Sequence, residues 1–131
     1  MPQAIDLVVN NGAQTPVSKT FSLVSPAAGD NAVATWALKE GAISTVFPIL
    51  TASAGKTPRG RNLKVKFRLP SSYTDTVTGL TVVNSACEMN VTYSVPSDFP
   101  EALKPDFVAF SNNILNTALL RSMIRDAVSA N

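Results

Sequence analysis

Residues 62–69 read Asn-Leu-Lys-Val-Lys-Phe-Arg-Leu, so that apolar and basic side chains alternate without interruption. Successive side chains of a β-strand point to opposite faces of its sheet, and this period of two therefore predicts a strand with one covered and one solvated face. Cys87–Val95 repeats the pattern. Cys87, Met89, Val91, Tyr93 and Val95 are expected to point inward, and Glu88, Asn90, Thr92 and Ser94 outward. Such alternation is typical of antiparallel sheets with one wet face, so we expect that arrangement here, with Cys87 buried in a core between the sheet and the helices.

Shorter strands are expected on the N-terminal side of this pair. The turn residues Asn10-Asn11-Gly12 predict a hairpin, and Pro48 predicts a bulge or an unpaired stretch because proline cannot donate to a ladder. Ala54–Gly60 is expected to be a loop, since it contains two glycines and a proline. The expected strands are Ile5–Asn10, Thr20–Ser25, Asn31–Lys39 and Ile43–Ser53, and Ser71–Asn84 is expected to form a long hairpin excursion whose outer ends are still strand.

The last quarter of the chain has helical periodicity. Pro96 ends the sheet, and Pro105 suits the first turn of a helix. The pair Asn116-Thr117 predicts a break, giving two helices over about residues 105–129. Their apolar residues occupy more than the single stripe that packing on one sheet requires. We therefore expect a second copy of the chain to cover them in a two-fold dimer; the alternative is that the two helices pack on each other.

Composition limits the class of protein. The length of 131 residues fits one domain, 1–131. Because 45% of the residues are apolar and only 15% are charged, the composition excludes a disordered chain. One cysteine and no histidine exclude an intrachain disulfide, a cysteine-based zinc site and a Ser–His or Cys–His nucleophile pair. No membrane span or secretory signal is recognisable. We expect a binding or assembly protein that is not an enzyme, with no cofactor, no metal, no small-molecule substrate and no membrane partner.

The basic residues are concentrated. Although the formal net charge is only +2, six of the eleven basic residues lie within one stretch, without an intervening acid: Lys56, Arg59, Arg61, Lys64, Lys66 and Arg68. Arg59 and Arg61 are expected in the loop that leads into the strand. A sheet face lined by cations and small polar groups suits phosphate contacts, and Asn90 and Thr92 add hydrogen-bonding groups. The alternative is a merely solvated strand whose lysines prevent aggregation.

Several strings, in this order and spacing, resemble the coat proteins of single-stranded RNA bacteriophages of the levivirus type. They are Asn31–Trp36, Arg59–Leu69, Asn90–Pro96 and the helical stretch from Asp106. The resemblance implies an α+β fold with an N-terminal β-hairpin, a five-stranded antiparallel sheet (hairpin and sheet about 5–96) and two C-terminal helices. It also implies an interlocked homodimer with a ten-stranded sheet, and a quasi-icosahedral shell around the viral RNA in the virion, assembled in the cytoplasm of a bacterial host.

The resemblance further implies that the sheet faces the genome and binds one RNA hairpin, so that the protein represses translation of the replicase. The family's RNA-facing lysine falls on Lys66, its neighbour on Lys64, its asparagine on Asn90 and its valine on Val33. Glu88 stands where some members have a base-stacking tyrosine, which suggests a different hairpin. The full set of expected RNA-binding residues is Val33, Thr35, Thr51, Ser53, Arg59, Arg61, Lys64, Lys66, Arg68, Glu88, Asn90 and Thr92.

Two other classes of protein are alternatives to this interpretation. One is a stand-alone dimeric RNA-binding regulator that forms no shell, and the other is an enzyme. The absence of histidine and of paired carboxylates in register argues against the enzyme.

Overall fold

The computed structural model describes residues 3–41 and 43–130. The chain forms two compact units, Met1–Val95 and Pro96–Asn131, and each is described by itself. The single domain expected over 1–131 includes positions 1, 2, 42 and 131, which lie outside the described residues.

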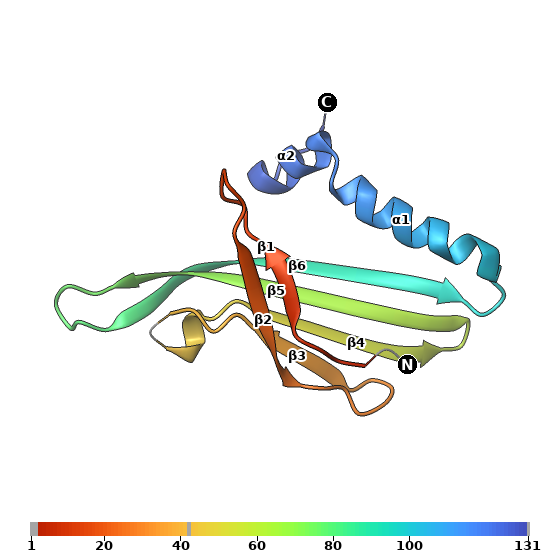
Figure 1. Ribbon diagram of the computed structural model, residues 1–131, viewed down its shortest axis with the longest axis horizontal. Coiled ribbons are helices and arrows are strands. Elements are labelled where there is room, and N and C mark those ends of the chain that lie inside the picture. Colours follow the sequence, from red (N-terminus) through yellow and green to blue (C-terminus); the bar gives the residue numbers. More distant parts are fainter. Residues whose placement is uncertain (1–2, 42, 131) are drawn as a thin grey trace. The chain divides into compact units, whose positions relative to one another are not determined.

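The first unit is an antiparallel sheet with the strand order β1-β2-β3-β4-β5-β6 (Figure 1). The strands β4, β5 and β6 are the long ones, and β1, β2 and β3 are shorter. The bounds are β1 Leu7–Asn10, β2 Ser18–Ser25, β3 Val33–Ala37, β4 Ile49–Thr57, β5 Gly60–Thr74 and β6 Thr81–Pro96. The expected five-stranded sheet with a separate hairpin is thus corrected to six strands.

The extra strand joins the sheet because β2 has two partners. Residues 18–21 of β2 pair with β1, and residues 22–25 pair with β3. The register shifts between Leu23 and Ser25, as in a β-bulge, and bulges bend the strand that carries them. The N-terminal hairpin is therefore continuous with the main sheet.

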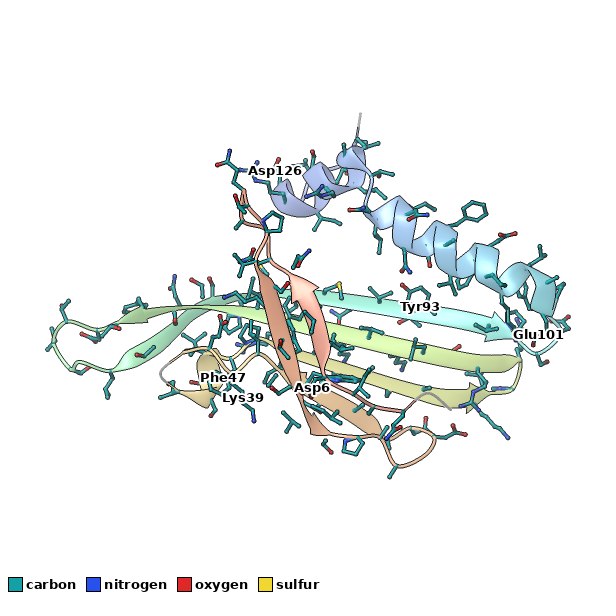
Figure 2. All side chains as sticks on the ribbon, in the orientation of Figure 1. Asp6, Lys39, Phe47, Tyr93, Glu101 and Asp126 are labelled. Atoms are coloured by element: carbon teal, nitrogen blue, oxygen red, sulfur yellow. The ribbon has the colours of Figure 1, made fainter. Side chains whose placement is uncertain are left out.

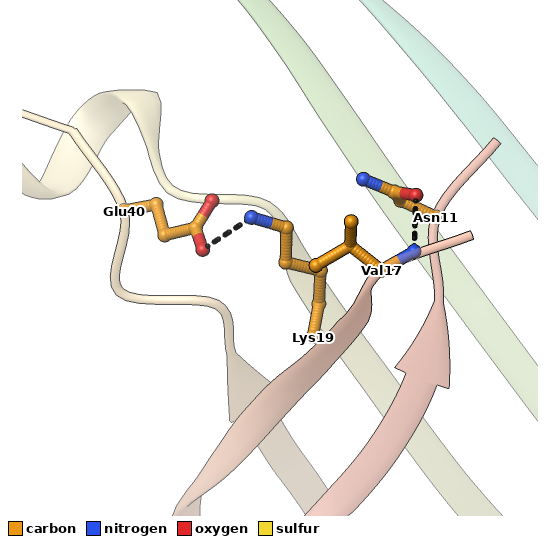
Figure 3. A network of polar contacts seen from close by, with 4 residues as sticks. All are labelled: Asn11, Val17, Lys19 and Glu40. Carbon is orange, nitrogen blue, oxygen red and sulfur yellow. Dashed lines mark hydrogen bonds and ion pairs between the residues drawn. The ribbon is translucent and has the colours of Figure 1, made fainter. Parts of the chain in front are cut away.

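The loop of this hairpin is longer than the Asn-Gly signal predicted. The Asn11 N–H donates to the Val17 carbonyl at 2.9 Å, and the Asn11 side-chain oxygen accepts from the Val17 N–H at 3.0 Å (Figure 3). Asn11 thus closes a loop over residues 11–17. Beyond it, Lys19 of β2 forms an ion pair with Glu40 at 3.0 Å, which ties the return strand to the segment after β3 (Figure 3).

The predicted strand Ile43–Ser53 is confirmed only from Ile49 onward, with the expected interruption at Pro48, and the predicted loop Ala54–Gly60 shrinks to the turn of Pro58 and Arg59. Ser44–Val46 is a 3-10 turn (η1), and β4 continues to Thr57, which pairs with Gly60 around a two-residue turn. Buried Pro48 lies just before β4, and its carbonyl accepts from the Leu38 N–H at 2.9 Å. Because proline has no N–H to donate, the ladder begins after it.

The β5–β6 hairpin agrees with the prediction, because the strand continues to Thr74 and resumes at Thr81. Its tip is organised by Asp75, whose carboxylate accepts from the Val77 N–H at 2.8 Å and whose carbonyl accepts from the Gly79 N–H at 2.7 Å. Gly79 has a φ of +72°, a conformation that glycine adopts without strain.

Little of the first unit is fully buried. Among the described residues the buried apolar side chains are Phe21, Ala34, Ala37, Val46 and Pro48. Phe21 packs edge-on against Phe67, with the ring centroids 5.9 Å apart. The Trp36 indole N–H donates to the Ile5 carbonyl at 2.7 Å. Cys87 is exposed and Met89 is 41% exposed. Burial of Cys87 is predicted for the assembled protein, and it stays a prediction that the single chain does not test.

The second unit contains a 3-10 turn η2 (Glu101–Leu103) and the helices α1 (Lys104–Leu115) and α2 (Ala118–Asp126). Pro105 lies in the first turn of α1, as predicted. The predicted break also holds, because Thr117 caps α2 and accepts from the Leu120 N–H at 3.4 Å. The helical stretch ends at Asp126, before the predicted end at about residue 129, because Ala127 has a left-handed φ of 54°.

Neither helix contains a buried residue. Side chains project from all sides of α1 (Figure 2). The exposed fractions are high for apolar groups: Val108 55%, Phe110 65%, Ile114 53%, Leu119 61% and Ile124 64%. The predicted excess of apolar helix surface is therefore present.

Candidate nucleic-acid interface

Strand register brings most of the predicted site residues onto one face of the sheet. Opposite residues in adjacent antiparallel strands share a face. The pairs therefore define three rows across β3, β4 and β5: Val33–Ser53–Lys64, Thr35–Thr51–Lys66 and Ala37–Ile49–Arg68. We call this surface of β3–β6 the basic face.

Strand β6 adds its own row to the basic face. Glu88 lies 4.0 Å from Arg68, measured between the carboxylate Oε1 and the guanidinium Nε, so the two side chains share a face. Side chains alternate along a strand, and Asn90 and Thr92 therefore lie on the same face as Glu88. Both are exposed.

Cations on this face are regularly spaced. Lys64, Lys66 and Arg68 are exposed, and alternate residues of a strand are separated by about 6.8 Å along it. Neither lysine forms an ion pair within residues 3–41 and 43–130. A row of unpaired cations beside hydroxyl groups can bind the phosphates of an extended polyanion.

Two hollows lie on this part of the sheet. One, of about 300 Å³, is lined by residues from three strands, among them Ile49, Thr51, Lys66, Glu88 and Asn90. The other, of about 350 Å³, is lined by Asn31, Ser53, Gly55, Asn62 and Lys64 among others. The first hollow brings together five of the predicted site residues: Thr51, Lys66, Arg68, Glu88 and Asn90.

Asn31 and Asn62 were missed in the sequence as site residues. Asn31 has a positive φ of 65°, and its N–H donates to the Ala54 carbonyl at 2.7 Å. Its side-chain oxygen fills the space where a Cβ would stand on Gly55. Asn62 could have been found, because it continues the alternation of Lys64 and Lys66, whereas the position of Asn31 depends on a tertiary contact.

Arg61 does not belong to the basic face. Arg61 pairs with Lys56 in the ladder. It lies three residues before Lys64, and because side chains alternate along a strand, an odd separation places Arg61 on the opposite face. There its guanidinium contacts the Asp30 carboxylate at 2.5 Å. This hydrogen bond and charge lower the pKa of Asp30 and raise the pKa of Arg61. The expected position of Arg61 in the loop is therefore corrected: it lies in β5, which begins at Gly60, and alternation places it on the face opposite the basic one.

Arg59 lies in the two-residue turn between β4 and β5. It is exposed, and no ion pair to it is found in the part of the chain that the structure describes. It is therefore at the end of the hairpin rather than on the face of the sheet.

The described residues contain neither a metal-binding cluster nor a membrane-spanning helix. Residues 3–41 and 43–130 contain no group of three or more His, Cys, Asp or Glu side chains placed to hold a metal ion. None of the helices described is long and apolar enough to cross a membrane.

Comparison with known proteins gives the family. Residues 2–131 match the model of the levivirus coat protein family. Similar solved structures include the virus-like particle of bacteriophage NT-214, with a TM-score of 0.87, 21% identity and coverage of 99% of this chain and 100% of that one. The virus-like particle of bacteriophage ESE058 has a TM-score of 0.81, 20% identity and coverage of 99% and 100%. The bacteriophage GA protein capsid has a TM-score of 0.67 and 18% identity, with coverage of 95% of each chain.

At these identities the likeness to solved structures establishes the fold, and the family model carries the assignment. No curated protein sequence matches the chain significantly. The match nevertheless covers almost every residue, including both helices and all six strands. The chain belongs to the levivirus coat protein family, and it is a non-enzymatic structural component of the virion capsid.

Proposed function

We propose that this coat protein forms an interlocked homodimer, assembles into an icosahedral shell around the viral RNA, and binds an RNA hairpin through its basic face. The hairpin binding would make it the translational repressor of the replicase. Virus-like particles of the similar proteins support the shell. The single observation that carries the RNA assignment is the set of in-register rows of cations and hydroxyl groups on the basic face.

The exposed surface of the chain supports a large interface. The chain exposes 9962 Å², whereas a folded monomer of 13.8 kDa exposes about 6,600 Å². The excess is about 3,300 Å² per chain, or about 6,600 Å² for two chains, which is above the usual range of about 2,000–5,000 Å² of total area in obligate interfaces. The exposed apolar residues include helix side chains such as Phe110 and Ile124, and these belong to the surface that a partner's sheet would cover.

Cys87 supports the same arrangement. It lies in β6 with Met89 and Val91 in alternation, on the face opposite the basic one, and it is exposed in the single chain. If the partner's helices cover this apolar face, Cys87 becomes buried on dimerisation. The whole chain then acts as one coat protein domain whose core is completed by the second copy.

The basic face supports RNA binding by its charge and its chemistry. Lys64 and Lys66 supply unpaired cations, and Thr51 and Ser53 supply hydroxyl groups in the adjacent strand. Phosphate contacts position an RNA without reading its sequence, whereas Asn90 can hydrogen-bond to a base edge. A two-fold dimer would place two such surfaces in one continuous sheet.

Size-exclusion chromatography with electron microscopy of the purified full-length protein tests this function. A shell elutes near the void volume and contains nuclease-protected RNA. A stable dimer that binds RNA but forms no particles would contradict the shell and favour a stand-alone RNA-binding regulator. A folded monomer that persists at low concentration would contradict the interlocked dimer, because obligate dimers unfold as they dissociate.

A further inference from the structure

Glu88 is the exceptional residue of the basic face. The strands β3, β4, β5 and β6 contain no other acidic residue. It lies within a set of cations and neutral polar groups, where a carboxylate repels the phosphates that the surface would otherwise attract. A negative charge at this position weakens phosphate binding and therefore needs another explanation.

The Glu88 carboxylate is accessible and weakly engaged. Its side chain is 64% exposed, and its one ion pair, to Arg68, spans 4.0 Å, which is longer than a hydrogen bond. No hydrogen bond to the Glu88 carboxylate occurs among the described residues of the chain. Arg68 therefore lies near the carboxylate but constrains it little, and the carboxylate oxygens are free to accept hydrogen bonds from a ligand.

An ionised carboxylate only accepts hydrogen bonds. RNA offers such donors on the edges of its unpaired bases, which proteins read in loops and bulges. Guanine presents two adjacent donors, N1–H and the N2 amino group, which match the two oxygens of a carboxylate. Cytosine and adenine each present one amino group there, and uracil presents one N–H between two carbonyl oxygens, which a carboxylate repels.

The surroundings of Glu88 suit a base. It lines the hollow of about 300 Å³, which is at the lower end of the volumes of ligand pockets. Ile49 supplies the apolar surface there, Asn90 a second polar group, and Lys66 a cation for the neighbouring phosphate.

We propose that Glu88 is a specificity-determining residue that selects an unpaired guanine in the bound RNA loop. The proposal rests on the RNA-binding function proposed above and adds the base that the surface prefers. Two charge-assisted hydrogen bonds to one base give a preference of about 5- to 150-fold over a base that cannot form them.

The test uses the full-length dimer and a panel of stem-loops with one common stem. At each loop position in turn the nucleotide is G, A, C, U or inosine, which is guanine without the N2 amino group. Dissociation constants are measured for wild type, for Glu88→Gln, and for the control Glu40→Gln, which removes the same charge from the segment after β3.

At one loop position we expect wild type to bind G about 5- to 150-fold more tightly than U, with inosine at least about fivefold weaker than G. Glu88→Gln should reduce the G-to-U ratio toward one and strengthen binding of the U loop, because a repulsive charge is gone. Glu40→Gln should change all loops by one common factor. If Glu88→Gln weakens binding of the G loop and strengthens binding of the U loop, the carboxylate reads the base; general repulsion would instead make the variant bind every loop more tightly.

Three results overturn the proposal: no preference for G in wild type, an unchanged G-to-U ratio in Glu88→Gln, or equal strengthening of all loops by that variant. Lys66→Ala distinguishes the two levels of failure. If Lys66→Ala weakens RNA binding while any of those three results holds, only the guanine assignment fails. If Lys66→Ala leaves RNA binding unchanged, the basic face is not the RNA site and both proposals fail.

Discussion

Replacing Lys66 by alanine should remove one phosphate contact without disturbing the fold. Lys66 is exposed, lies opposite Thr51 in the middle row of the basic face, and forms no ion pair within the described residues. Each phosphate contact contributes about 0.7 to 0.9 to the slope of log K against log salt. The slope of Lys66→Ala should therefore be shallower by that amount, and one contact accounts for about a threefold change in affinity between about 50 and 200 mM salt.

The assay is equilibrium binding of one stem-loop RNA to the dimer at several salt concentrations. Arg61→Ala is the matched control, because it also removes one cation from β5 but from the opposite face, where the guanidinium is engaged with Asp30. Its salt slope should equal that of wild type. The reasoning is refuted if Lys66→Ala keeps the wild-type slope, or if Arg61→Ala loses as much slope as Lys66→Ala.

Three further predictions concern packing, assembly and pH. Gly55→Ala should destabilise the fold by less than about 1 kcal/mol in denaturant unfolding, because the added Cβ meets the end of the flexible Asn31 side chain, which can move aside. The double variant with Asn31→Gly, which accepts the positive φ of that residue, should show no further loss from the added Cβ, and a loss of several kcal/mol in Gly55→Ala would contradict this account of the contact. Phe110→Asp should abolish particles in electron microscopy, because it puts a charge on helix surface that is 65% exposed in the single chain and that the proposed dimer would cover. Normal particles would show that this surface stays in solvent. Pairing with Arg61 lowers the pKa of Asp30 below its ordinary value of 3.8. The stabilisation by this pair is therefore complete above pH 3.8 and is lost as the pH falls through the lowered pKa. The acid-unfolding curve of Asp30→Asn should match that of wild type only at the lowest pH, and curves that coincide at every pH would contradict the pair.

Alternation along the strands made much of the fold predictable. The stretches 62–69 and 87–95 have a strict period of two, and both are strands. The Thr117 cap and the proline of α1 likewise act through local backbone chemistry, so the two helices and their break could be read from the sequence. The positions of Lys64, Lys66 and Arg68 on one face of β5 then follow from the same alternation.

Features that depend on tertiary contacts could not be predicted. Residues 54–57 resemble a loop because of Gly55, yet they are strand and pair with residues 60–63 of β5, while the side chain of Asn31 occupies the space that the glycine leaves. That extension of the hairpin is also what turns Arg61 to the other face. The position of Cys87 depends on what covers the sheet, which alternation within one chain does not specify.

The most direct test of the account is an electron-microscopy reconstruction of the particles formed when the full-length protein is expressed in bacteria. The account predicts closed shells built from interlocked dimers, with the helices of one chain on the sheet of its partner and RNA density against Lys64 and Lys66. RNA density against the opposite face of the sheet, or dimers whose helices stay on their own sheet, would contradict it.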